Sequence, residues 1–157
     1  MDFRTHVLPT DPDHVRRMAV SSGFFRDDEV PVAVELVEET LARGPAAGYS
    51  YIFADVGGVP VGYACFGLLS CTLARYGLYW IIVDNECRGQ GIGRELLRRV
   101  EDAVRSDGGE RLYIETSMRE LYAPTRRFYE KCEYVIAAEL PEYYARGDGK
   151  VIYLKCL

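Results

Sequence analysis

Residues 88–93, with the sequence Arg-Gly-Gln-Gly-Ile-Gly, are the segment of the chain that most clearly suggests a chemistry. They stand between an apolar run and a segment with the pattern of an amphipathic helix. The first N–H groups of a helix lack internal partners, and the helix dipole is positive at that end. Glycines also let the backbone approach a ligand closely. We therefore predict that this loop binds the phosphates of a cofactor; a tight turn with incidental glycines is the alternative.

The spacing of the glycines narrows the choice of cofactor. A dinucleotide-binding loop has the pattern G-x-G-x-x-G near the start of a longer βαβ array, whereas here the pattern is G-x-G-x-G in mid-chain. A Walker loop ends in G-K-S or G-K-T, and this loop does not. The spacing therefore excludes both of these common nucleotide-binding loops.

Residues 88–93 match the R/Q-x-x-G-x-G/A motif of the GNAT superfamily, the acetyl-CoA-dependent N-acyltransferases. Residues 80–87 also resemble the central strand and turn of that family, and the resemblance covers essentially the whole chain. It implies that acetyl-CoA is the donor, that its pantetheine arm pairs with a strand edge and that the loop amides hold its pyrophosphate. The cofactor-binding residues that it implies are Ile82, Val83, Arg88, Gly89, Gln90, Gly91, Ile92, Gly93 and Arg94.

A second motif, residues 128–134, resembles the F-Y-x-x-x-G-F segment of the same family. Tyr129 then matches the tyrosine whose hydroxyl lies near the coenzyme sulfur and protonates the departing thiolate. The alternative is a plain core tyrosine, because this position also falls on one face of a predicted helix. The chain departs from the family at Glu133, which occupies the glycine position, and at Tyr122, where an asparagine is common.

The reaction also needs a general base, because an amine acceptor is usually protonated near neutral pH and must lose a proton. Relatives often place a carboxylate on the central strand, and the corresponding position here is Gly77. Glu115, on the neighbouring predicted strand, is the best remaining carboxylate and our candidate for the base. A salt-bridged surface glutamate is the alternative for Glu115. A water chain that ends at a backbone carbonyl or at Tyr79 would also serve.

Aromatic residues are the candidates for the acceptor site. In the family, the region between the first two helices lines this site, and here that region contains two consecutive phenylalanines. The residues expected to contact the substrate are Phe24, Phe25, Tyr79 and Tyr143. Anchoring of the loop in the core and packing within a hairpin are the alternatives. Residues 143–148 resemble part of the ribosomal-protein N-terminal acetyltransferases.

Three functions are compatible with these motifs. The leading hypothesis is an N-acetyltransferase that moves an acetyl group from acetyl-CoA to the primary amine of a small molecule by direct attack, without a cysteine nucleophile. The second is an acetyltransferase for a protein or peptide N-terminus. The third is a non-catalytic CoA-binding sensor or interaction domain, which Gly77 favours and an intact Tyr129 opposes.

These motifs need secondary-structure elements that bring them together. Apolar patterns and turn signals predict strands over residues 3–8, 51–56, 59–69, 78–83, 111–116, 134–140 and 150–157. They predict helices over residues 11–22, 28–43, 91–105 and 124–132. Residues 78–83 are apolar throughout, which predicts a central strand buried on both faces. We expect one α/β (α+β) domain over residues 1–157, with a mixed, mostly antiparallel central sheet and helices on both faces.

Composition limits the partners and the location. A net charge of −5 argues against a nucleic-acid partner. No apolar run approaches the roughly 20 residues of a membrane span, and the N-terminus has no apolar signal segment, so we expect no membrane partner and a cytoplasmic location. Five cysteines without a C-x-x-C pair, and two histidines near the N-terminus, predict no metal site. A homodimer is compatible with the sequence.

Overall fold

The computed structural model describes residues 1–157, and seven strands form one sheet in the order β1-β2-β3-β4-β5-β7-β6. Only β4 and β5 run parallel, and every other neighbouring pair is antiparallel. The predicted mixed, mostly antiparallel sheet is therefore confirmed. The strands are β1 (Asp2–Arg4), β2 (Ser50–Val56), β3 (Val59–Leu68), β4 (Arg75–Val83), β5 (Arg111–Ser117), β6 (Val135–Ala145) and β7 (Asp148–Cys156).

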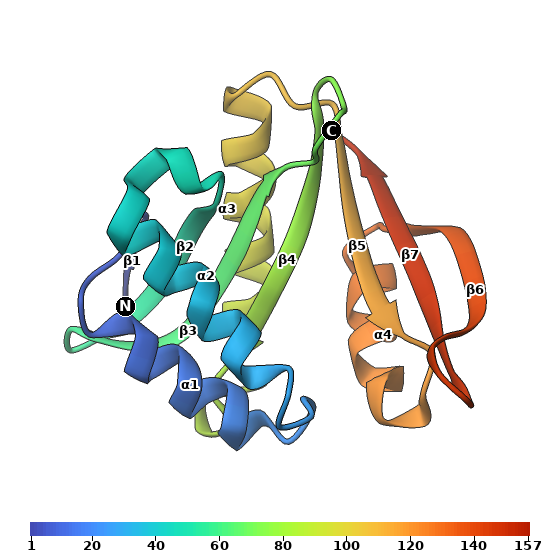
Figure 1. The fold of residues 1–157 in the computed structure, drawn as a ribbon, viewed down its shortest axis with the longest axis horizontal. Helices are drawn as coiled ribbons and strands as arrows, with labels where there is room; N and C mark the ends of the chain where they lie inside the picture. Colours follow the sequence, from blue (N-terminus) through green and yellow to red (C-terminus); the bar gives the residue numbers. More distant parts are fainter.

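Four α-helices cover both faces of the sheet (Figure 1). They are α1 (Asp11–Ser22), α2 (Val30–Arg43), α3 (Ile92–Ser106) and α4 (Ala123–Lys131), with short 3-10 turns η1 (Gly44–Ala47), η2 (Asn85–Cys87) and η3 (Glu120–Tyr122). Helices α1 and α2 pack on one face through a core that contains Phe53 and Tyr63. Helices α3 and α4 pack on the other face, in a core that contains Leu96 and Tyr129. None of the helices is long and apolar enough to cross a membrane.

Strand β1 is shorter than the strand predicted over residues 3–8. The guanidinium of Arg4 forms ion pairs with Asp11 at 2.6 Å and with Asp55 at 2.7 Å. The carboxylate of Asp11 also accepts a hydrogen bond from the backbone N–H of Leu8 at 2.7 Å. These contacts direct the chain away from the sheet after Arg4 and towards α1, which begins at Asp11, so the predicted strand was too long.

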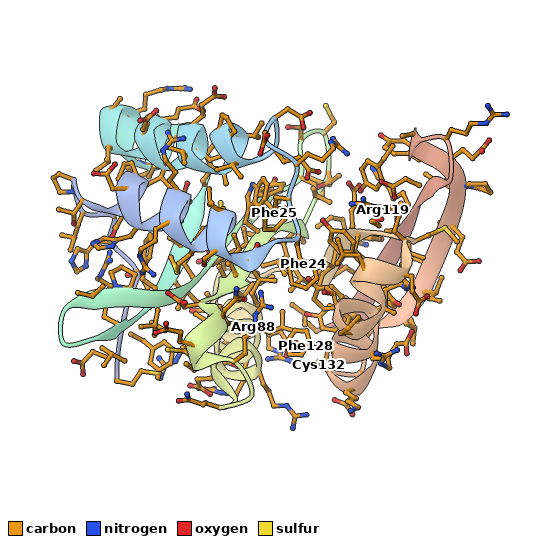
Figure 2. All side chains as sticks on the ribbon, turned by 90° about the horizontal axis from the view of Figure 1, so that it is seen from below. Phe24, Phe25, Arg88, Arg119, Phe128 and Cys132 are labelled. Atoms are coloured by element: carbon orange, nitrogen blue, oxygen red, sulfur yellow. The ribbon has the colours of Figure 1, made fainter.

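The sheet opens between its two central strands. β4 pairs with β5 only from Arg75 to Leu78. A β-bulge interrupts the pairing of β3 with β4 at the same level, because Leu78 and Trp80 pair with consecutive residues of β3 and Tyr79 has no partner. The two halves of the molecule therefore meet near the C-terminus and diverge towards the opposite end (Figure 1), and Figure 2 shows the opening from below.

The prediction that residues 78–83 are buried on both faces is wrong, because the sheet opens along the second half of this strand. Leu78 is buried, but the Tyr79 side chain is 38% exposed, and Trp80, Ile81 and Val83 are half-buried. Because β5 diverges, one backbone edge and several side chains of this strand face the opening. The apolar run does mark a central strand, but its second half lines a cleft.

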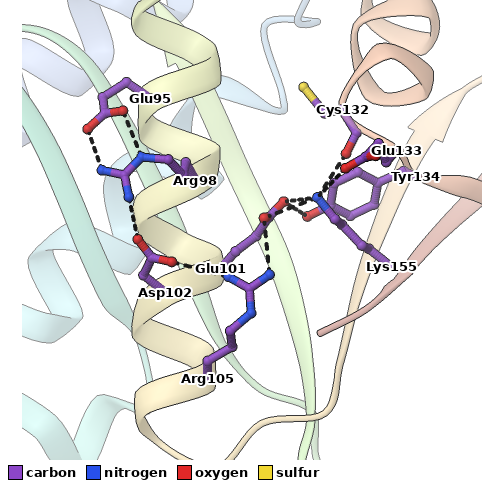
Figure 3. A network of polar contacts seen from close by, with 9 residues as sticks. All are labelled: Glu95, Arg98, Glu101, Asp102, Arg105, Cys132, Glu133, Tyr134 and Lys155. Atoms are coloured by element: carbon purple, nitrogen blue, oxygen red, sulfur yellow. Dashed lines mark hydrogen bonds and ion pairs between the residues drawn. The ribbon is translucent and has the colours of Figure 1, made fainter.

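A buried charge network joins the C-terminal half of the sheet to α3 (Figure 3). Glu101 of α3 is 6% exposed, and the Nζ atom of Lys155 on β7 lies 3.1 and 3.2 Å from its carboxylate oxygens. The same ammonium donates to the carbonyl of Cys132, just after α4, at 3.0 Å. The hydroxyl of Tyr134 donates to Glu101 at 3.0 Å. The network therefore holds α4 and β7 against α3.

We predict that Lys155→Met destabilises the protein, because it leaves the carboxylate of Glu101 buried without its main cation. The expected loss is about 3 kcal/mol in the free energy of unfolding, measured by urea denaturation. Arg98→Met is the matched control, because Arg98 lies on the same helix and its two ion pairs are exposed. The control should change stability little, and equal losses in the two variants would contradict an anchoring role for the buried network.

Candidate functional site

A cleft of about 910 Å³ lies between the two halves of the sheet. This volume is within the range of small-molecule sites. The cleft is lined by the α1–α2 loop, the second half of β4, the loop that leads into α3, the end of β5 and α4. The predicted cofactor residues that line it are Ile82, Val83, Arg88, Gly89, Gly91, Ile92, Gly93 and Arg94. Gln90 is exposed and is not part of the lining.

The free edge of β4 forms one wall of the cleft. The N–H of Asp84 donates to Val61 of β3 at 2.8 Å, so by strand alternation the backbone of Ile82 also faces β3. The backbone N–H and C=O groups of Ile81 and Val83 therefore point to the opposite edge, where β5 has diverged. The predicted backbone contact at Ile82 is thus corrected to Ile81, because Ile82 faces β3. Arg88 agrees with this orientation, because its Nε donates to the carbonyl of Val83 at 3.4 Å. Polar backbone groups are thus available along the cleft wall.

The loop before α3 has the geometry of an anion site. Gly89 and Gly91 have φ values of +75° and +82°, which side chains with a Cβ rarely adopt. The first helical hydrogen bond runs from the N–H of Glu95 to the carbonyl of Gly91 at 3.1 Å. The N–H groups at 92–94 therefore have no partner within the helix. They lie at the positive end of the helix dipole, beside the side chains of Arg88 and Arg94.

Tyr129 combines burial with access to the cleft. Its side chain is 4% exposed, yet it contributes to the cleft lining. Its ring packs against those of Phe128, Tyr134 and Tyr153 at centroid distances of 5.4, 6.2 and 5.7 Å. Burial raises the pKa of the Tyr129 hydroxyl above its usual value. The hydroxyl therefore stays protonated at neutral pH and can donate a proton.

Glu133, which stands where the family has glycine, takes the backbone conformation of a glycine. Its φ is +69°, in the left-handed region. The N–H groups of Cys132 and Tyr134 donate to the carbonyl of Tyr129 at 3.0 and 3.1 Å and close the end of α4. The departure in sequence therefore leaves the local path of the chain intact.

Packing explains why a carboxylate is absent at Gly77. Gly77 lies opposite Gly67 of β3, and the ring of Tyr79 lies over both glycines. A Cβ at Gly77 would come within 2.8 Å of the Leu69 side chain and 3.3 Å of the Tyr79 ring. Tyr79 also packs edge-on against Tyr49 at 5.8 Å, and burial raises the pKa of its hydroxyl. A tyrosine therefore occupies the space next to the position where relatives often carry the base.

Glu115 lies in the cleft lining, and its side chain is 55% exposed. Its carboxylate forms an ion pair with the ammonium of Lys150 at 2.9 Å. The structure thus places Glu115 both in the cleft and in a salt bridge.

Three of the four residues predicted to contact the substrate line the cleft, namely Phe24, Phe25 and Tyr79. Tyr143 does not, because its ring lies over the Lys150 ammonium at 3.7 Å and is 56% exposed. Its neighbour Tyr144 lines the cleft instead. The cause is a register shift between β6 and β7 after Leu140, which adds residues to β6 and turns its tip.

Two residues join the halves of the molecule across the cleft. The hydroxyl of Tyr122, at the start of α4, donates to the backbone carbonyl of Phe24 at 2.8 Å. The two rings also pack at 5.5 Å, and the guanidinium of Arg88 lies over the ring of Phe24 at 5.0 Å. Tyr122 stands where the family often has asparagine, so this departure creates a bridge. The sequence carried no signal for that contact.

Comparisons with known proteins identify the family of this chain. The family model for the acetyltransferase (GNAT) family matches residues 15–134. An uncharacterized N-acetyltransferase of Methanocaldococcus jannaschii is 30% identical over 105 residues, which cover 67% of this chain and 65% of the relative. A crystal structure from Desulfovibrio desulfuricans, assigned to GNAT acetyltransferases, has 45% identity and a TM-score of 0.97, covering 99% of this chain and 98% of that one.

A more distant structure, an aminoglycoside 6′-N-acetyltransferase complexed with coenzyme A, has 20% identity and a TM-score of 0.77. It covers 99% of this chain and 97% of that one, and at this identity it shows the shared fold alone. The chain belongs to the GNAT family of acetyltransferases. The resemblance inferred from residues 88–93 and 128–134 is thus confirmed, and enzymes of this family use acetyl-CoA as the acyl donor.

We predict that Gly93→Asp separates folding from cofactor binding. Gly93 is the second residue of α3, and a carboxylate there is favoured by the helix dipole. The same carboxylate would repel a phosphate at the N–H groups of 92–94. The melting temperature of the free protein should therefore change little, whereas the increase caused by coenzyme A should disappear.

Gly93→Ala is the control for this experiment. It adds a Cβ at ordinary contact distance, 3.5 Å from Phe128, without adding charge. The alanine variant should keep the coenzyme-dependent increase in melting temperature. A full increase in Gly93→Asp would show that the phosphates bind elsewhere.

Proposed function

We propose that this chain transfers an acetyl group from acetyl-CoA to the primary amine of a small molecule, with Tyr129 as the general acid. The observation that carries the proposal is the meeting of three features in one cleft. These are the free edge of β4, the unpaired N–H groups at the start of α3, and the protonated hydroxyl of Tyr129. Each feature matches one part of the donor: the amide-bearing arm, the pyrophosphate and the sulfur.

The residues of the cleft suit the donor in charge and in geometry. The backbone of Ile81 and Val83 can pair with the pantetheine arm as an added strand would. The N–H groups at 92–94, with Arg88 and Arg94, can hold the pyrophosphate. Gln90 faces solvent, so we assign it no contact with the cofactor.

The chemistry follows from the positions of the proton donors and acceptors. The neutral amine attacks the thioester carbonyl, the C–S bond breaks, and the coenzyme thiolate leaves. The hydroxyl of Tyr129 protonates that thiolate, and the proton lost by the amine leaves through water. Glu115 is the carboxylate in the cleft that we propose as the acceptor of this proton, and the hydroxyl of Tyr79 is the alternative.

The bridge between Tyr122 and Phe24 favours a small acceptor over a protein N-terminus. It spans the cleft and joins the α1–α2 loop to α4, which limits the space for an extended peptide. An acetyl-CoA turnover screen against amines, amino acids and peptides, with free thiol as the readout, tests this choice. Turnover restricted to peptides would overturn it in favour of a peptide acetyltransferase, and no turnover with any acceptor would favour the non-catalytic alternative.

We predict that Tyr129→Phe lowers kcat by about 100-fold, because it removes the proton donor for the thiolate. The increase in melting temperature with coenzyme A should remain, because the ring keeps its packing. Steady-state kinetics and thermal unfolding measure the two effects.

Tyr153→Phe is the matched control for this prediction. Tyr153 packs against Tyr129, but its hydroxyl donates to Glu130 at 3.0 Å and does not line the cleft. This variant should keep a kcat close to that of the wild type. Equal losses of kcat in both variants would mean that Tyr129 acts only through packing.

A further inference from the structure

Charged side chains divide the cleft into two ends. Arg88 belongs to the loop before α3 and Arg94 to the first turn of that helix, whereas Arg119 follows β5. Figure 2 shows that Arg119 faces Phe25 at one end of the opening, whereas Arg88 and Phe128 lie at the other. The end that holds Arg119 is therefore separate from the proposed phosphate site.

The structure holds the backbone of Arg119 in a fixed position. Its backbone N–H donates a hydrogen bond to the hydroxyl of Ser117 at 3.1 Å, which restricts the conformation of the turn. Its carbonyl accepts a hydrogen bond from the guanidinium of Arg126 at 2.8 Å, and the same guanidinium donates to the carbonyl of Ser117. These contacts fix the loop from which the Arg119 side chain extends into the cleft.

The charge and the N–H donors of the Arg119 guanidinium are only partly paired with groups of the protein. Its Nε atom is buried and has no hydrogen-bond partner, although the carboxylate of Asp148 lies 3.3 Å away. That carboxylate accepts a hydrogen bond from the hydroxyl of Ser117. The ring of Tyr122 lies against the guanidinium at 5.5 Å and restricts its plane. The side chain is 37% exposed, so the remaining N–H groups can reach a ligand.

Two carboxylates from other elements line the same cleft as this arginine. They are Glu29 at the start of α2 and Glu115 on β5. A guanidinium binds the carboxylate of a ligand with two parallel hydrogen bonds. The carboxylates of the protein can in turn bind the ammonium group of a ligand. The cleft therefore presents groups for both charges of a zwitterion.

We propose that the acceptor carries a carboxylate close to its amine, as a free amino acid does, and that Arg119 binds this carboxylate. The inference rests on the proposed function, because it assigns the substrate class of the same site. The amine would lie on the side of Glu29 and Glu115 and face the thioester. A simple amine or the N-terminus of a peptide has no carboxylate next to its amine and would leave Arg119 with Asp148 alone.

Matched acceptors test this inference. Each free amino acid is compared with its carboxamide and with the decarboxylated amine, by turnover with acetyl-CoA and by the increase in melting temperature in the presence of coenzyme A. For the wild type we expect the acid to have a kcat/KM higher by about tenfold or more, as a charge-assisted pair predicts. Arg119→Gln should raise KM for the acid and bring the acid-to-amide ratio close to one.

Arg127→Gln is the control, because it removes the same charge from an exposed position of α4 outside the cleft. It should keep the preference of the wild type. Better turnover of amides or amines than of their acids would overturn the inference and leave the proposed function intact. No thiol release with any acceptor would overturn the proposed function; the inference would then fail if acid and amide raised the melting temperature equally.

Discussion

The site depends on how briefly β4 and β5 pair. They are joined only from Arg75 to Leu78, and the bulge at Tyr79 marks the point where they diverge. Backbone N–H and C=O groups that lose a strand partner must be satisfied by water or by a ligand. The edge at Ile81 and Val83 is therefore prepared for an extended, amide-bearing molecule. The same divergence creates the cleft that the loop before α3 and Tyr129 line.

An open sheet needs contacts that hold its halves at a constant separation. On one face, Lys155 and Glu101 join β7 and the end of α4 to α3. Across the cleft, Tyr122 joins the start of α4 to the carbonyl of Phe24. Both ends of α4 are thus held, and Tyr129 lies between them. This arrangement sets the distance between the proposed acid and the edge of β4.

The parts of the site that could be predicted from the sequence are those with local requirements. Gly89 and Gly91 adopt a left-handed backbone, and the residue type and spacing alone indicate this conformation. The positions of Arg119 and Tyr144 in the cleft could not be predicted, because they depend on the loop after β5 and on the register shift of β6. The exposure of the second half of β4 depends in turn on the divergence of β5, a non-local event that no pattern within residues 78–83 records.

The most direct test of this account is amide hydrogen exchange along β4, measured by NMR with and without acetyl-CoA. The N–H groups of Ile81 and Val83 should exchange readily in the free protein and become protected when the cofactor binds. The N–H of Ile82, which faces β3, should be protected in both states and serves as the internal control. Saturating acetyl-CoA that left the exchange of Ile81 and Val83 unchanged would contradict the claim that the open edge of β4 binds the cofactor.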